Sequence, residues 1–95
     1  MADERVEMTA FLTAKPGKEA EMRVALRELV AETVKEPGCI LFRILEDLER
    51  PGTFVLWEIF QDREALRVHM EKDHTRAYFT KGLNDRTQVM KLKTV

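Results

Sequence analysis

The chain has 95 residues, of which 16 are lysine or arginine and 17 are aspartate or glutamate, so its formal net charge is −1. This balance, without any run of like charge, predicts neither nucleic acid nor a membrane as a partner. A single cysteine, a polar start and no apolar run near the ~20 residues that span a bilayer lead us to expect one cytoplasmic domain over residues 1–95.

The first part of the chain predicts a strand and then a helix. Residues 5–14 alternate between two faces, which is typical of a strand, and Pro16-Gly17 ends it. Residues 18–35 change to helical spacing, with an apolar inner side and a charged outer side. Glu36-Pro37-Gly38 ends this helix, because the residue before a proline disfavours helical backbone angles.

The second part predicts a hairpin, a helical segment and a last strand. Residues 39–47 and 53–61 are two strands joined by a short turn, so we expect them to be antiparallel. Asp62 is a good N-cap for the next helix, and Asp73 is a candidate break where a second short helix begins. With a strand over residues 86–95, the order is β-α-β-β-α-β. This order predicts an α+β, ferredoxin-like fold, with one antiparallel sheet and helices on one face.

The strands are apolar on both faces, which predicts a dimer. The third strand carries Phe54 and Leu56 on one face and Val55 and Trp57 on the other. The helices of one chain can cover only one of these faces. A second sheet across a two-fold axis is the simplest cover for the other face. The competing interpretation is that the central strand alone is unusually apolar.

Three polar residues fall where the pattern predicts interior positions. Glu58 lies within the apolar third strand, His69 on the inner face of the following helix, and His74 near its candidate break. A buried carboxylate needs a partner or must be neutral, and a nearby histidine could accept a proton from a substrate. The structural alternatives are an ion pair of Glu58 with Arg43 or with an arginine of a partner chain, a hydrogen-bonded core histidine at position 69, and a cap or surface residue at position 74.

Other sites are less favoured by the sequence. His69 and His74 lie five positions apart, which places them on different faces of a helix unless it breaks, so we expect no metal site. Cys39 is more readily explained as a small buried residue than as a nucleophile. No glycine-rich phosphate loop indicates a nucleotide cofactor.

Taken in order, several short motifs resemble the antibiotic biosynthesis monooxygenase family over nearly the whole chain. The residues that carry the resemblance are Pro16-Gly17, Glu36-Pro37-Gly38-Cys39, Phe54, Glu58, Phe60, Asp62, Ala65, Leu66, His69 and His74. The resemblance implies a homodimeric α-β barrel with a pocket between sheet and helices. It also implies an oxygenase without flavin, haem or metal, in which a deprotonated quinol or related aromatic substrate itself reduces dioxygen.

The resemblance also suggests roles for individual residues. His69 would be the base or would stabilise the anion, Glu58 would orient it or bind a substrate hydroxyl, and His74 would close the pocket. Haem-degrading relatives carry an asparagine and a tryptophan where this chain has Ala10 and His69, which argues against haem. The candidate substrate-binding walls, chosen by face, are Ala10, Phe42, Leu56, Tyr78, Phe79 and Met90.

Two other functions are compatible with the same scaffold. An isomerase or lyase would use the same base without consuming dioxygen, and a more polar or basic pocket would favour it. A non-catalytic ligand-binding or stress-related dimer would have Glu58 and His69 joined in a buried pair with no cavity beside them. The oxygenase requires both residues to face one cavity.

Overall fold

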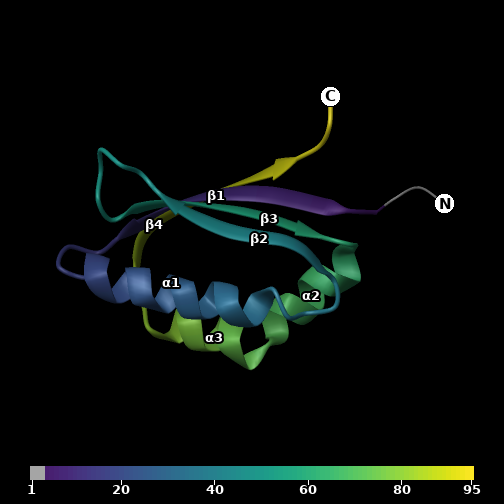
Figure 1. The fold of residues 1–95 in the computed structure, drawn as a ribbon, viewed down its shortest axis with the longest axis horizontal. Coiled ribbons are helices and arrows are strands. Elements are labelled where there is room, and N and C mark those ends of the chain that lie inside the picture. The colour runs from purple at the N-terminus through teal and green to yellow at the C-terminus, as the bar shows by residue number, and fades with distance from the viewer. Residues whose placement is uncertain (1–3) are drawn as a thin grey trace.

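The computed structural model describes residues 4–95, and this part of the chain forms four strands and three helices (Figure 1). In chain order they are β1 (Val6–Ala14), α1 (Glu19–Thr33), β2 (Cys39–Glu46), β3 (Thr53–Phe60), α2 (Arg63–Glu71), α3 (Asp73–Thr80) and β4 (Asn84–Leu92).

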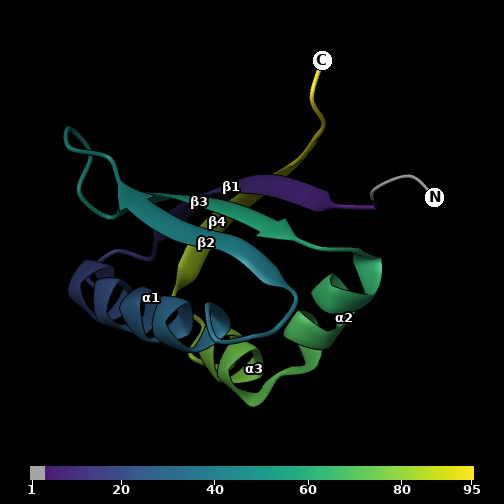
Figure 2. The same cartoon turned by 45° about the vertical axis from the view of Figure 1, so that its right-hand side comes forward.

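The strands form one antiparallel sheet in the order β2-β3-β1-β4. All three helices lie against the same side of this sheet (Figures 1 and 2). The non-sequential strand order with helices on one face is the ferredoxin-like arrangement, so the predicted fold class is confirmed.

The core lies between the helices and the side of the sheet that faces them. In the register of the sheet, Ala10 of β1 pairs with Leu56 of β3 on one side and with Val89 of β4 on the other, so these three side chains share the helix-facing side. The apolar stripe of α1 packs onto this side. The buried core residues are Ala10, Leu12, Met22, Ala25, Leu26, Leu29, Phe42, Phe54, Phe60, Tyr78 and Leu83.

The second helical segment breaks in two, as its sequence suggested. Asp62 caps α2, because its Oδ1 accepts a hydrogen bond from the backbone N–H of Ala65 at 2.8 Å. Lys72 then takes extended backbone angles, with φ −66° and ψ 148°, and α3 begins at the next residue. The break changes the direction of the chain between His69 and His74.

The side of the sheet turned away from the helices is apolar and uncovered by residues 4–95. Phe11, Trp57 and Met90 lie on it, and their side chains are 42%, 39% and 41% exposed. Monomeric proteins rarely leave so many large apolar side chains together in water. Within the described residues, no helix combines the length and the apolar character needed to cross a membrane.

Candidate functional site

A buried carboxylate joins the two histidines. Glu36 Oε2 lies 2.8 Å from His69 Nδ1 and 2.6 Å from His74 Nε2. Glu36 and His69 are buried, and their side chains are 6% and 4% exposed, whereas His74 is 20% exposed. A carboxylate oxygen can accept two N–H groups, so the arrangement holds both rings in a fixed orientation.

Local structure explains how these residues meet. Glu36 is held in a turn after α1, in which its N–H donates to Thr33 and its carbonyl accepts from Cys39. Gly38 allows the turn to lie against α2, because a Cβ at this position would overlap Ala65 Cβ. The break at Lys72 brings His74 to the same carboxylate that His69 contacts. The expectation that the two histidines lie apart holds only for an unbroken helix.

A cavity of about 190 Å³ lies between the sheet and the helices, next to this cluster. Glu58 and His69 both line it, so the two residues face one space as the oxygenase hypothesis requires. The other lining residues are mostly apolar: Met8, Ala10, Leu12, Leu26, Leu29, Phe42, Leu56, Met70, Thr75, Tyr78, Phe79, Asn84, Thr87 and Val89. None of the described residues that line the cavity is a lysine or an arginine.

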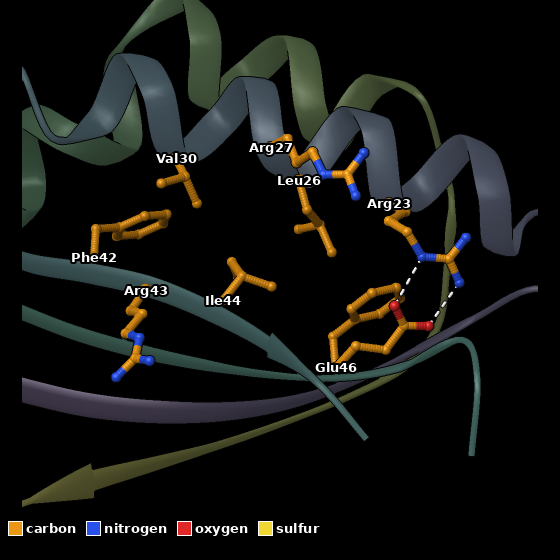
Figure 3. Close-up of a pocket in the computed structure, with 9 residues that line it drawn as sticks. Arg23, Leu26, Arg27, Val30, Phe42, Arg43, Ile44 and Glu46 are labelled. Atoms are coloured by element: carbon orange, nitrogen blue, oxygen red, sulfur yellow. Dashed lines mark hydrogen bonds and ion pairs between the residues drawn. The ribbon is translucent and has the colours of Figure 1, made fainter. Parts of the chain in front are cut away.

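Glu58 is a buried acid without a partner. Its side chain is only 7% exposed, and among residues 4–95 it makes no hydrogen bond or ion pair. Burial alone raises the pKa of Glu58 to about 7, because the ionised form loses its hydration. The suggested ion pair with Arg43 does not form: Arg43 pairs with Trp57 in the sheet register and points away from the helices (Figure 3).

His69 has one nitrogen committed and one available. Its ring lies among aromatic side chains, with centroids 5.3 Å from Phe42 and 4.9 Å from Phe60. Nδ1 contacts Glu36, whereas Nε2 has no hydrogen-bond partner among the described residues. If the Nδ1 hydrogen points at the carboxylate, Nε2 carries the lone pair and can accept a proton. The pair Glu36–His69 therefore has the chemistry of a positioned general base.

Tyr78 lines the cavity, but its hydroxyl is a hydrogen-bond donor to Asn84 and is not a candidate base. Its hydroxyl donates to Asn84 Oδ1, and burial raises the pKa of Tyr78 to about 12. The phenol therefore stays protonated at neutral pH. Tyr78 contributes shape and one fixed hydroxyl to the wall.

The structure places most of the expected residues in this cavity, with two differences. Ala10, Phe42, Leu56, Tyr78 and Phe79 line it together with Glu58 and His69. Met90 does not, because it pairs with Thr9 on the uncovered side of the sheet, while its neighbour Val89 faces the helices. His74 does not line the cavity either, because its ring turns to Glu36 behind His69.

Glu36 is the residue of this site that sequence reasoning missed. Its position before Pro37-Gly38 suggested only a helix end, although it belongs to the motif that carries the family resemblance. The signal that could have identified it is an acidic residue in a turn whose next two residues, Pro37 and Gly38, have no polar side chain. Together Glu36, His69 and His74 place three possible metal-ligand atoms within 4.8 Å of one another.

A second cleft of about 360 Å³ opens between α1 and β2 (Figure 3). Arg23 of α1 reaches across it and donates to both oxygens of Glu46 at 2.7 and 2.6 Å. This pairing and the Gly52 N–H hold the pKa of Glu46 down, at about 2. Leu26 and Phe42 line both this cleft and the inner cavity, so they form the wall between them.

Comparison with known proteins shows the family and the fold of this chain. The family described as "Antibiotic biosynthesis monooxygenase" matches residues 5–81. The uncharacterized protein YjcS of Bacillus subtilis is 42% identical over 57 residues, which are 58% of this chain and 52% of YjcS, so the match spans about half of that relative.

Solved structures of two similar proteins share the whole fold. The protein PA3566 of Pseudomonas aeruginosa is 25% identical with a TM-score of 0.91, over 100% of this chain and 97% of PA3566. A structure titled as an antibiotic biosynthesis monooxygenase is 27% identical with a TM-score of 0.87, over 95% of this chain and 98% of the other.

Proposed function

Because this chain belongs to the antibiotic biosynthesis monooxygenase family, we propose that it is a monooxygenase that oxidises a small quinol with dioxygen and uses no added cofactor. The observation that carries the proposal is that Glu58 and the Glu36-held His69 face one apolar cavity. A water-poor cavity with a fixed base favours formation of an electron-rich quinol anion, the species that can reduce dioxygen.

The size of the cavity limits the substrate. An engineered apolar cavity of about 150 Å³ holds benzene, and the cavity here measures about 190 Å³. We therefore expect a quinol of one ring, or of two rings with movement of Phe79, rather than a polycyclic polyketide. Phe79 lines the cavity and is 57% exposed, so its side chain has room to move outward.

The proposed reaction assigns one step to each polar residue. His69 Nε2 takes the proton of a ring hydroxyl, and Glu36 stabilises the resulting imidazolium. The anion transfers electrons to dioxygen, and one oxygen atom bonds to a ring carbon. The O–O bond then breaks, and the second oxygen leaves as water with two hydrogens of the quinol. Quinol plus dioxygen thus gives hydroxyquinone plus water, and no external reductant is needed.

Glu58 would act on the oxygen side of this reaction. With its pKa raised to about 7, a large fraction of Glu58 is neutral at physiological pH and can donate a hydrogen bond. A neutral acid beside a developing peroxide anion stabilises it without adding negative charge to the cavity. This assignment makes Glu58 a proton donor and His69 the base, rather than two groups with the same role.

The active form would be a dimer across the uncovered side of the sheet. The large apolar side chains there, Phe11, Trp57 and Met90 among them, would be buried against the same side of a second copy. Sedimentation of the wild type should show a dimer, and Trp57→Asp should shift it to a monomer. A monomeric wild type at micromolar concentration would contradict this part of the proposal.

Dioxygen uptake tests the activity. Metal-free protein is mixed with reduced benzoquinols, naphthoquinols and a polycyclic quinol, and the excess uptake over buffer is measured. His69→Ala should lower the saturating rate by ~10²-fold or more, as expected for loss of a catalytic base, while the surface variant Glu21→Gln keeps it. No excess uptake with the whole panel would reject the oxygenase. The isomerase or lyase alternative calls for a more polar or basic pocket, whereas the described residues that line the cavity are mostly apolar and include no lysine or arginine.

A further inference from the structure

We infer that Glu36, His69 and His74 form a binding site for a divalent first-row transition-metal ion, with Zn²⁺ as the probe, and that metal binding turns the base off. Two imidazoles and one carboxylate are a ligand set that such ions favour. The cluster is preformed, because its ligand atoms already lie within 4.8 Å of one another.

The present distances are those of a hydrogen-bonded cluster that needs little change to hold a metal. The two nitrogen–oxygen distances are 2.8 and 2.6 Å, whereas ligand atoms around a tetrahedral Zn²⁺ lie ~3.3 Å apart for bonds of about 2.0–2.1 Å. From the Glu36 oxygen, His69 Nδ1 would withdraw by roughly 0.5 Å and His74 Nε2 by roughly 0.7 Å. His74 is the most exposed of the three ligands and follows the break at Lys72, so an ion would enter from its side.

Metal binding would change which nitrogen of His69 carries the hydrogen. With Nδ1 donating to Glu36, a neutral His69 ring offers the lone pair of Nε2 to the cavity. A metal ion at Nδ1 needs the lone pair there, so the neutral ring must carry its hydrogen on Nε2. The ring keeps its charge and releases no proton, but it meets the cavity as a hydrogen-bond donor. The binding inference stands on the cluster alone, whereas the loss of the base rests on the proposed function.

The composition of the chain makes this site easy to isolate. It has two histidines, and both are in the cluster, so no other imidazole can bind the probe. Cys39 is the only thiol and lies three residues after Glu36, so it is the competing ligand to remove. Glu58 also lines the cavity beside His69, but it is not part of the cluster, so its substitution serves as a second control.

Binding is measured by calorimetric titration of the EDTA-treated, dialysed full chain with Zn²⁺. We expect one ion per chain. Glu36→Gln and His74→Ala should each weaken Zn²⁺ binding by about 100-fold, because loss of a ligand should cost at least as much as the ~10–100-fold known for changes in outer-shell residues. Cys39→Ala and Glu58→Gln should leave the affinity for Zn²⁺ unchanged. No binding by the wild type, retention in His74→Ala, or loss in Cys39→Ala would each overturn the inference.

A second measurement needs no variant and no activity. Long-range ¹H–¹⁵N spectra of the wild-type imidazoles report the tautomer of each ring, and one equivalent of Zn²⁺ should move the His69 hydrogen from Nδ1 to Nε2. Unchanged tautomers would overturn the site even if calorimetry showed uptake. Zn²⁺ binding with this switch but without any quinol oxidation would uphold the site and reject the oxygenase. Full dioxygen uptake at saturating Zn²⁺ would reject the control of the base.

Discussion

Two glutamates on the same face of the sheet have opposite electrostatic properties. Glu46, at the end of β2, is paired with Arg23 in the open cleft, and its pKa is lowered to about 2. Glu58, in the middle of β3, is buried without a partner, and its pKa is raised to about 7. The cleft and the cavity that hold them share the wall of Leu26 and Phe42.

The difference supports assigning the proposed chemistry to one of the two regions. A carboxylate that is already neutralised by an arginine joins α1 to β2 and has little capacity to exchange a proton near neutral pH. A carboxyl group kept near its midpoint by burial destabilises the fold, and such groups are found where a protein needs an acid or base. The inner cavity, rather than the larger cleft, is therefore the region to which we assign the reaction.

The largest effect should come from removing the wall between the two regions. Phe42 is 4% exposed and lies against Phe60 and His69. Phe42→Ala should lower the free energy of unfolding by ~3–5 kcal/mol, the usual cost of a large core cavity. Urea unfolding at neutral pH measures it, and Phe42→Leu is the milder control. A loss below ~1 kcal/mol would mean that the wall collapses to fill the space.

The pH dependence of stability should isolate Glu58. Its pKa rises from 4.5 in the unfolded chain to about 7 in the folded one, so the folded state holds its proton longer and stability falls as the pH rises through this window. Glu58→Gln removes that dependence. The stability of the variant relative to the wild type should grow by about 3 kcal/mol between about pH 4 and pH 8.5. Urea unfolding across this range is the measurement, and parallel curves would show that Glu58 is solvated.

A substitution at Gly38 should affect the cluster beside the cavity and leave the cleft unchanged. A methyl group at this position would overlap Ala65 and push the Glu36 turn away from α2. Gly38→Ala should cost ~1–3 kcal/mol, as overpacking does, and should weaken the contact between Glu36 and His69. The ring signals of His69 and the unfolding free energy measure the two effects, and the Arg23–Glu46 pair should be unaffected. Gly17→Ala is not a matched control, because Gly17 has φ +82°.

Glu46 should give the smallest effect, and its sign with pH is opposite to that of Glu58. Because the pKa of Glu46 is depressed, its contribution is present above about pH 4.5 and is lost as the pH falls toward 2. Glu46→Gln should therefore be slightly less stable than the wild type at pH 7, and the two should converge in acid. The pair is partly solvated, which keeps the difference small. A gap that widens in acid would contradict the assignment.

Local sequence patterns predicted the order and type of the elements and many of the residues that line the cavity. Alternation over residues 5–14, the hairpin from 39 to 61 and the Asp62 cap are local patterns, since neighbouring residues decide them. Glu58 and His69 could be placed inside because they interrupt apolar faces. Met90 was misplaced because the alternation of the last strand defines two faces without saying which one meets the helices.

Which polar groups pair and which stay alone could not be predicted from local patterns, because it depends on how distant segments pack. Glu36 reaches His69 and His74 across 33 and 38 positions of chain, through a glycine contact and a helix break that no local pattern ranks. Arg43 lies opposite Trp57, so its strand turns it away from Glu58, while Arg23 finds Glu46 from another element. Periodicity assigns a side chain to a face, but hydrogen bonds and burial depend on distances between segments far apart in sequence, and those distances are set by packing.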